Sequence, residues 1–146
     1  MSMPNSHIVF GEKLKDDIFS DVAKEKAFEI FQGGLDQRGT QTKNKSTQLR
    51  KFYDELVMWT EKVHTAIKLE PGQKSSDVRA ERYRQSAPFI KMMNAKVAYA
   101  KGRNHVDASF EAMFSHCIKA INDADSLKHA KLFMEAFMGF YKAQEK

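Results

Sequence analysis

Five histidines and a single cysteine are the residues of this chain best suited to holding a transition metal. They are His7, His64, His105, His116, His129 and Cys117. A zinc site on a helix needs ligands three or four residues apart on one face, and no pair of these histidines has that spacing together with a carboxylate or thiolate partner. His116 and Cys117 are adjacent, so they point to different faces of a helix. We therefore expect neither a metal nor a cofactor.

Asp123 and Asp125 form the other pair that could do chemistry, because two nearby carboxylates can hold Mg²⁺ in a nuclease. A short acidic link between two helices is also what N-capping produces, and we favour caps. The chain has no glycine-rich phosphate loop, no nucleophile elbow and no His-Glu pair at the spacing of zinc proteases. We predict a binding protein and not an enzyme.

The basic residues are concentrated in two segments. From Gln37 to Tyr53 there are five Lys or Arg and no acid: Arg38, Lys43, Lys45, Arg50 and Lys51. From Arg79 to Arg103 there are seven against Glu81 alone: Arg79, Arg82, Arg84, Lys91, Lys96, Lys101 and Arg103. The net charge of the whole chain is only +5, so the rest of the chain is net acidic. Such segregation of charge is typical of proteins that bind a polyanion such as RNA.

Arg50 and Lys51 fall in the first turn of a predicted helix, where cations oppose the helix dipole at a cost of about 0.3 to 1 kcal/mol each. The free N–H groups of a helix start, with the side chains of Thr47 and Gln48, donate to anions. Lys43 and Lys45 precede them, and together these groups predict a phosphate site. Chance clustering of lysines is the competing interpretation.

Lys96, Tyr99 and Arg103 are spaced to lie on one helical face, which suits a sugar-phosphate backbone. In the alternative interpretation, Tyr99 lies at the edge of the core and the Lys96 side chain lies over it. Arg103 then only stabilises the C-terminal end of the helix, which carries partial negative charge. The basic stretch around Arg79 and Arg82 can contact RNA or a neighbouring protein. The complete set of candidate RNA-binding residues is Lys43, Lys45, Thr47, Arg50, Lys51, Arg79, Arg82, Lys96, Tyr99 and Arg103.

Helical periodicity between glycine and proline marks predicts the elements that position these residues. The expected helices run from about 16 to 32, from a cap at Ser46 or Thr47 towards Pro71-Gly72, from near Ser76 to Gly102, from a cap at Asp107 to about 121, and from Asp125 or Ser126 to about 141. The third is interrupted or re-entered at Pro88, at a place where a first helical turn tolerates proline. In the first, Ile18, Val22, Phe28 and Phe31 form the apolar face. The second carries the clearest apolar stripe, at steps of three and four residues: Leu49, Phe52, Tyr53, Leu56, Thr60, Val63 and Ile67. Residues 7–10 are the one candidate strand. We predict an all-α fold, a single compact bundle of about five helices.

Composition agrees with one domain spanning 1–146, in which 1–15 and 35–45 are flexible. The 146 residues include 11 Phe, 8 Met and 1 Trp, enough for a core, and with one cysteine no intrachain disulfide forms. No apolar run approaches about 18 residues and the start lacks a secretory pattern, so we expect a cytoplasmic protein without a membrane partner.

Three segments carry motifs of a known protein family: residues 45–53 read KSTQLRKFY, residues 89–103 read FIKMMNAKVAYAKGR, and residues 133–141 read FMEAFMGFY. In this order they resemble the start of the second helix, the central helix and the last helix of the small helical subunit of type III-A CRISPR effector (Csm) complexes. The resemblance covers about 45–141. Thr47, Arg50, Tyr99, Gly102 and Arg103 match its motifs, and the other candidate residues come from charge and position.

The resemblance implies a non-catalytic subunit that stacks in several copies beside the backbone subunits and near the large subunit. It implies that the copies hold guide RNA paired with target RNA by phosphate and sugar contacts, without reading bases, in antiviral defence. Two alternatives stay open. One is a helical module whose basic faces bind acidic proteins, and the other is the small subunit of a type III-B complex.

Overall fold

The computed structural model describes residues 3–145 and shows six α-helices in that range. They are α1 (Ala23–Gly33), α2 (Ser46–His64), α3 (Ser75–Lys91), α4 (Met93–Gly102), α5 (Ala108–Lys119) and α6 (Ala124–Gln144). Two 3₁₀ turns, η1 (Asn5–His7) and η2 (Gly11–Lys13), and a π-helical turn, η3 (Ile18–Val22), precede α1. No strand occurs among these described residues, and Leu35 and Gln41 form an isolated bridge. The predicted all-α bundle is confirmed.

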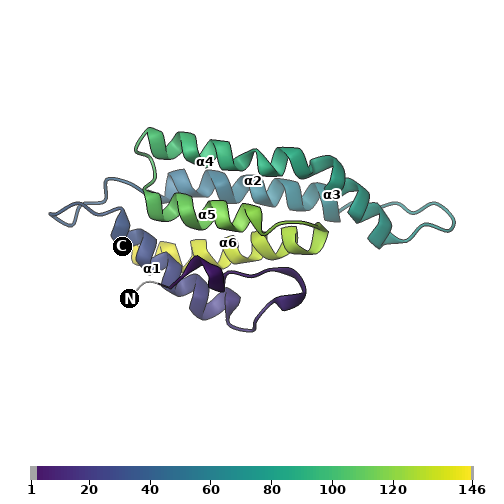
Figure 1. Ribbon diagram of the computed structural model, residues 1–146, viewed down its shortest axis with the longest axis horizontal. Coiled ribbons are helices and arrows are strands. Elements are labelled where there is room, and N and C mark those ends of the chain that lie inside the picture. The colour runs from purple at the N-terminus through teal and green to yellow at the C-terminus, as the bar shows by residue number, and fades with distance from the viewer. Residues whose placement is uncertain (1–2, 146) are drawn as a thin grey trace.

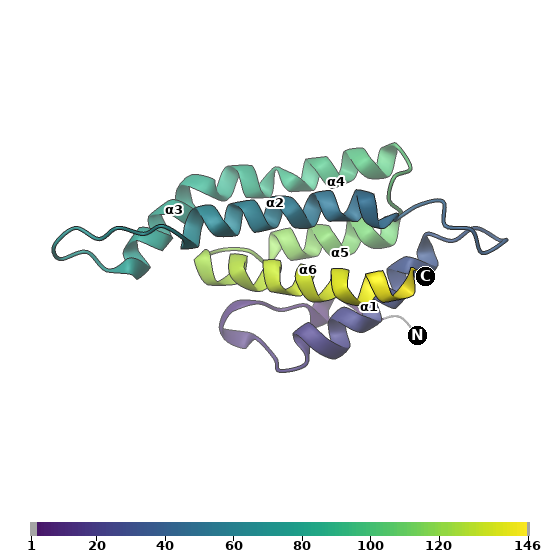
Figure 2. The same cartoon turned by 180° about the vertical axis from the view of Figure 1, so that it is seen from behind.

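The helices lie side by side along the long axis of the molecule (Figure 1). α6 packs between α1 and α2, and α3 with α4 forms one long edge beside α2 and α5 (Figures 1 and 2). The loop before α2 projects from one end of the bundle, and the loop between α2 and α3 projects from the other (Figure 2). The predicted five helices correspond to this arrangement, with the third broken into α3 and α4.

Aromatic rings from α2, α5 and α6 pack against one another in the core. Phe110 stacks on Phe114 at 5.7 Å between ring centroids, and Phe52 packs against both rings. Phe137 stacks on Tyr141 at 5.4 Å. Burying each such ring removes a large apolar area from water, so these contacts supply much of the driving force for folding.

The apolar stripe predicted for α2 is confirmed over most of its length. Its buried positions are Leu49, Phe52, Leu56, Thr60 and Val63. The helix ends at His64, however, so Ile67 lies beyond it, and Lys45 and not Ser46 or Thr47 is the N-cap residue. The Lys45 side chain makes no capping bond, which leaves the first turn of α2 without the usual Ser or Thr cap.

The buried face of the first helix differs from the predicted one. In η3 the N–H of Val22 donates to the carbonyl of Asp17 at 3.2 Å, an i to i−5 bond that inserts an extra residue into the turn. Ile18, Val22 and Ile30 are buried, but Phe28 is 51% exposed, so its predicted place in the core is wrong. The extra residue rotates the remainder of the helix relative to a regular α-helical count.

Pro88 lies inside α3, not in the first turn of a new helix as predicted. The helix passes through it and ends at Lys91, where the N–H of Met92 bonds to the carbonyl of Pro88 at 3.1 Å. The remaining caps are both aspartates, at Asp107 as predicted and at Asp123 rather than at Asp125 or Ser126. Asp107 caps α5 by accepting from the N–H of Phe110, and Asp123 caps α6 in a reciprocal capping box with Ser126.

Candidate nucleic-acid interface

The candidate residues separate into two groups at opposite ends of the bundle. The loop before α2, the start of α2 and the end of α4 meet at one end, where the N–H of Asn44 donates to the carbonyl of His105 at 3.0 Å (Figure 1). Arg79 and Arg82 belong to the first half of α3 and lie towards the other end (Figure 1). One surface of a single copy therefore does not unite all ten.

Asn44 holds the end of the loop against four other segments. Its backbone is in the left-handed region at φ +59°, and its side chain is fully buried. The amide nitrogen donates to the carbonyl of Ile30 at 2.9 Å and to the carboxylate of Asp107 at 3.0 Å. The backbone carbonyl oxygen of Asn44 accepts hydrogen bonds from the Tyr141 hydroxyl and from the side-chain amide of Gln41. Asn44 thus fixes where α2 begins relative to α1, α5 and α6.

A hollow of about 270 Å³ lies at the start of α2. Its lining residues are Ser46, Thr47, Arg50, Met138 and Lys142. The Arg50 side chain is 66% exposed, and Asp54 approaches it at 3.8 Å, a distance that leaves the guanidinium largely solvated. Lys142, from the last helix, adds a cation that the sequence did not indicate, because α6 lies outside both basic segments.

An internal carboxylate already contacts this helix start. Glu145, just after α6, accepts a hydrogen bond from the backbone N–H of Ser46 at 3.2 Å. The first N–H groups of a helix lack partners within the helix and carry partial positive charge, so they attract anions. The contact shows that the start of α2 is accessible to an oxyanion.

Arg50 and Lys51 diverge around α2. Successive residues of an α-helix are about 100° apart because a turn holds 3.6 residues. Arg50 faces the hollow beside α6, whereas Lys51 is exposed and donates to the side chain of Gln48 at 3.3 Å. The two cations therefore flank the outer face of α2, with exposed Thr47 between them in the preceding turn.

The α4 residues form the part of the candidate set with the clearest mutual contacts. Tyr99 is 66% exposed, so the alternative that it edges the core is wrong. The Arg103 guanidinium donates to the Tyr99 hydroxyl at 3.0 Å and lies over its ring at 5.7 Å from the centroid. Lys96 makes an ion pair of 2.8 Å with Glu55 of α2. Tyr99 and Arg103 thus form an exposed aromatic-cation pair.

Arg82 has partners inside the protein. Its guanidinium donates to the carbonyl oxygens of Lys62, Thr65 and Ala66 at 3.3, 2.6 and 3.2 Å. These carbonyls belong to the end of α2 and the residues just after it, where the last turn lacks internal donors. Arg82 therefore closes the C-terminal end of α2, and a role in RNA contact stays a prediction.

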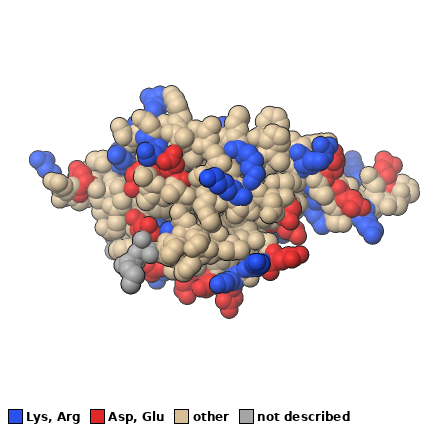
Figure 3. All heavy atoms as spheres, in the orientation of Figure 1, with Lys and Arg blue, Asp and Glu red and all other residues tan. Residues whose placement is uncertain are grey.

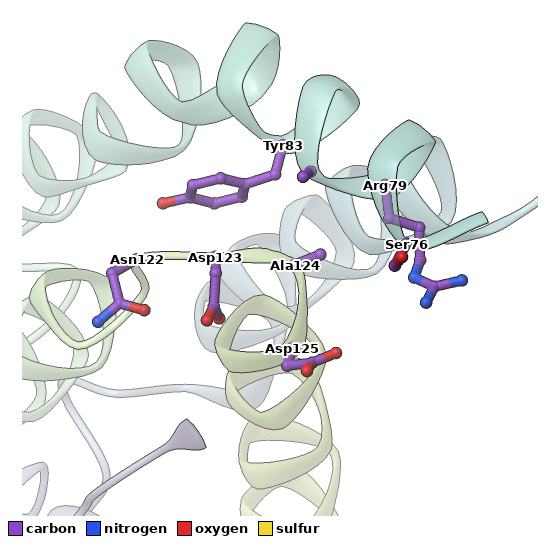
Figure 4. Close-up of a pocket in the computed structure, with 8 residues that line it drawn as sticks. Ser76, Arg79, Tyr83, Asn122, Asp123, Ala124 and Asp125 are labelled. Atoms are coloured by element: carbon purple, nitrogen blue, oxygen red, sulfur yellow. The ribbon is translucent and has the colours of Figure 1, made fainter. Parts of the chain in front are cut away.

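Arg79 lies at the edge of a separate pocket of about 320 Å³ between α3 and the start of α6. Figure 4 shows Tyr83 and Arg79 on one side and Asn122, Asp123 and Asp125 on the other. The Tyr83 hydroxyl donates to the carbonyl of Ile121 at 3.3 Å, and burial raises the pKa of this phenol. The mixed charge of this pocket is less suited to a phosphate than the start of α2.

Acidic side chains gather elsewhere on the molecule. Figure 3 shows several Asp and Glu side chains along the lower edge, where α1 lies, with Lys or Arg beside them, and both signs of charge on the rest of that face. This distribution matches the net acidic segment 1–36. Within residues 3–145, no helix has the length and apolar character that a bilayer crossing needs.

Comparison with known families gives the identity that the geometry leaves open. A family model described as Csm2 Type III-A matches residues 14–146, nearly the whole chain. The match extends beyond the resembling motifs to include α1. No curated protein and no solved structure matches the chain. The chain therefore belongs to the Csm2 type III-A family, the small subunits of type III-A CRISPR effector (Csm) complexes.

Proposed function

We propose that this chain is a non-catalytic, RNA-binding subunit of its Csm complex. Several stacked copies hold the duplex of guide RNA and target RNA through phosphate and sugar contacts, alongside the backbone and large subunits. The role belongs to antiviral defence in the cytoplasm. The observation that carries the proposal is the group of exposed side chains around the first turn of α2. Thr47, Arg50 and Lys142 line the hollow, and Lys51 lies beside them.

The chemistry of this surface supports binding without base recognition. Lysine, arginine, a hydroxyl and helix N–H groups are donors that suit phosphate oxygens, which every nucleotide carries. A stability-optimised helix start would carry acids here, whereas α2 has none in its first turn. The cost of placing cations there is offset when a polyanion binds. Lys43 and Lys45 extend the same surface into the preceding loop.

The end of α4 is the second part of the proposed surface. Lys96, Tyr99 and Arg103 follow one another along α4 and its C-cap, and Lys51 lies on the side of α2 that faces them. Arg79 and Arg82, at the far end, remain candidate contacts to RNA or to a neighbouring subunit. We expect them to contribute less, because three carbonyl groups engage Arg82 and two aspartates line the pocket of Arg79.

The test is a double substitution, Arg50→Ala with Lys51→Ala, measured by fluorescence anisotropy with two RNA duplexes of unrelated sequence. Both affinities should fall by a similar factor, about tenfold or more. The slope of log affinity against log salt should become shallower by about 2, because about two phosphate contacts are lost. Far-UV circular dichroism should be unchanged, since both side chains are exposed.

The matched control is Lys24→Ala with Lys128→Ala, which removes the same charge from exposed positions of α1 and α6. The control should retain most of the affinity. If both double variants weaken RNA binding equally, the overall positive charge of the protein, and not this surface, determines the affinity. An unchanged affinity in the Arg50 and Lys51 variant would show that the start of α2 is not the RNA site.

A further inference from the structure

An exposed stripe of apolar and cationic side chains runs along α3 and α4. Its members are Phe89, Met92, Lys96, Tyr99 and Arg103, spaced by three and four residues, and we call it the α3–α4 stripe. Phe89 is 52% exposed, Met92 50% and Tyr99 66%. Three of the six large apolar side chains found exposed in residues 3–145 therefore lie on this one line.

The neighbouring helix α2 completes the surface. Trp59 stacks on Phe89 with 5.8 Å between ring centroids and an interplanar angle of 14°, and Lys62 lies 5.5 Å from the centre of the Trp59 ring. The indole N–H donates to Glu55 at 3.0 Å, which holds Trp59 in place. One face of Phe89 is thus supported from within the protein, while much of its remaining surface is open to solvent.

The charge on this surface is strongly positive. Lys62, Lys96 and Arg103 carry the cations, and Glu55 forms an ion pair with Lys96. Both oxygens of Glu55 are already engaged, one by Lys96 at 2.8 Å and the other by Trp59. An arriving anion therefore meets a surface whose acid is neutralised and whose remaining cations are free to attract it.

Two kinds of partner can cover exposed aromatic rings. Protein interfaces are depleted of lysine, whereas surfaces that bind single-stranded nucleic acid combine aromatic rings with cations along a track. The α3–α4 stripe has the second composition. Phe89 and Tyr99 are ten residues apart, about 15 Å along a helix. A strand with stacked bases, rising about 3.4 Å per nucleotide, places about four nucleotides over that length.

We infer that the α3–α4 stripe stacks unpaired nucleobases of single-stranded RNA. Phe89, backed by Trp59, and Tyr99, backed by Arg103, are the two stacking platforms, and the Lys62 and Arg103 cations beside these rings attract the strand's phosphates. Stacking of this kind does not distinguish bases, since every base has a π-face. The inference rests on the proposed function and deepens it, because backbone contacts alone would treat abasic and ordinary RNA alike.

The experiment compares a short single-stranded RNA with an oligomer of the same length and phosphate number whose central nucleotides are abasic. Binding is followed by anisotropy at low salt and by the fluorescence of Trp59, the only tryptophan of the chain. We expect the affinity for the ordinary RNA to be higher than that for the abasic oligomer by about tenfold or more. We also expect it to change the Trp59 emission, because Trp59 contacts Phe89 directly.

The test variants are Phe89→Leu and Tyr99→Leu, separately and combined. Leucine keeps an apolar side chain but removes the ring, so the combined variant should bind the two oligomers equally. Phe28→Leu is the matched control, because Phe28 is an equally exposed ring on α1, 51% exposed, outside the stripe. It should preserve the preference for ordinary RNA. Melting curves confirm that each variant is folded.

The outcomes separate the inference from the proposed function. Equal affinity of the wild-type protein for ordinary and abasic RNA overturns the stacking inference and leaves the proposed function standing. Failure of the protein to bind single-stranded RNA, abasic RNA and RNA duplex overturns both. Sedimentation that shows self-association lost in the Phe89 and Tyr99 variants, with RNA binding unchanged, makes the stripe a protein interface and also overturns the inference.

Discussion

Asn44 and Asp107 exchange two hydrogen bonds across the end of the bundle that carries the proposed RNA surface. The Asn44 amide donates to the Asp107 carboxylate at 3.0 Å, and the Asp107 backbone N–H donates to the Asn44 side-chain oxygen at 2.9 Å. The same carboxylate caps α5 by accepting from Phe110 and from Ser109. The pair links the loop before α2 to the start of α5, so it sets the position of the α2 N-terminus.

We predict that Asn44→Ala lowers the free energy of unfolding by about 2 to 4 kcal/mol, measured by urea denaturation. The loss combines unsatisfied buried groups with the strain of a left-handed alanine. Asn104→Ala is the control, because Asn104 has φ +61° but is exposed. Asn104→Ala should lower the free energy of unfolding only through backbone strain, by about 1 to 2 kcal/mol. Equal losses in both variants would mean that the Asn44 side-chain bonds contribute nothing.

Gly34→Ala should destabilise the protein, whereas Gly139→Ala should stabilise it. A Cβ on Gly34 would overlap the backbone carbonyl of Lys43, and the Gly34 carbonyl itself accepts from Thr42 at 2.8 Å. We expect a loss of about 1 to 3 kcal/mol. Gly139 lies within α6 with open space around it, so alanine should add about 0.5 to 1 kcal/mol. Thermal melting shows whether each variant is less or more stable than the wild-type protein. An unchanged melting temperature of Gly34→Ala would contradict the close approach of Gly34 to the Lys43 carbonyl.

Arg82→Gln should lower stability without weakening RNA binding as much as loss of Arg50 and Lys51. Its guanidinium supplies donors to the last carbonyls of α2, and we expect a loss of about 1 kcal/mol, since the site is partly solvated. Arg84→Gln is a control for charge, because Arg84 is exposed and pairs with Glu81 of its own helix. If RNA affinity falls sharply in Arg82→Gln but not in Arg84→Gln, Arg82 contacts RNA directly.

Alkaline pH should destabilise the fold partly through Cys117. Burial raises the pKa of this thiol from 9.0 to about 12. Above pH 9 the unfolded chain loses the thiol proton while the folded protein keeps it, so stability falls by up to about 1.4 kcal/mol per pH unit until about pH 12. Urea denaturation at pH 8 and pH 10 measures the decline.

Cys117→Ala should show a shallower decline between these two pH values than the wild-type protein. Some decline should remain, because burial also raises the pKa of the Tyr141 phenol. The comparison uses the difference between pH values within each protein, so the cavity left by alanine does not affect it. An identical decline in both proteins would show that the thiol is not protected from ionisation in the folded state.

Much of the fold could be predicted because its signals are local. The stripe from Leu49 to Val63, the cap at Asp107 and the segregation of the basic segments depend on residues within a few positions of each other. Hydrogen bonds and side-chain faces in a helix repeat every three to four residues, so such patterns can be read directly. The departures at Phe28 and Pro88 arose where a π-turn or a tolerated proline broke that regularity.

The sequence by itself determined the helical class, the main core stripe and the presence of a cationic surface. The tertiary structure alone decided which cations share a surface: it brought Lys142 of α6 beside Arg50, turned Arg82 inward to the end of α2, and left Phe89 and Tyr99 exposed. These relationships join residues from different helices. They depend on how whole helices pack, which no local periodicity encodes.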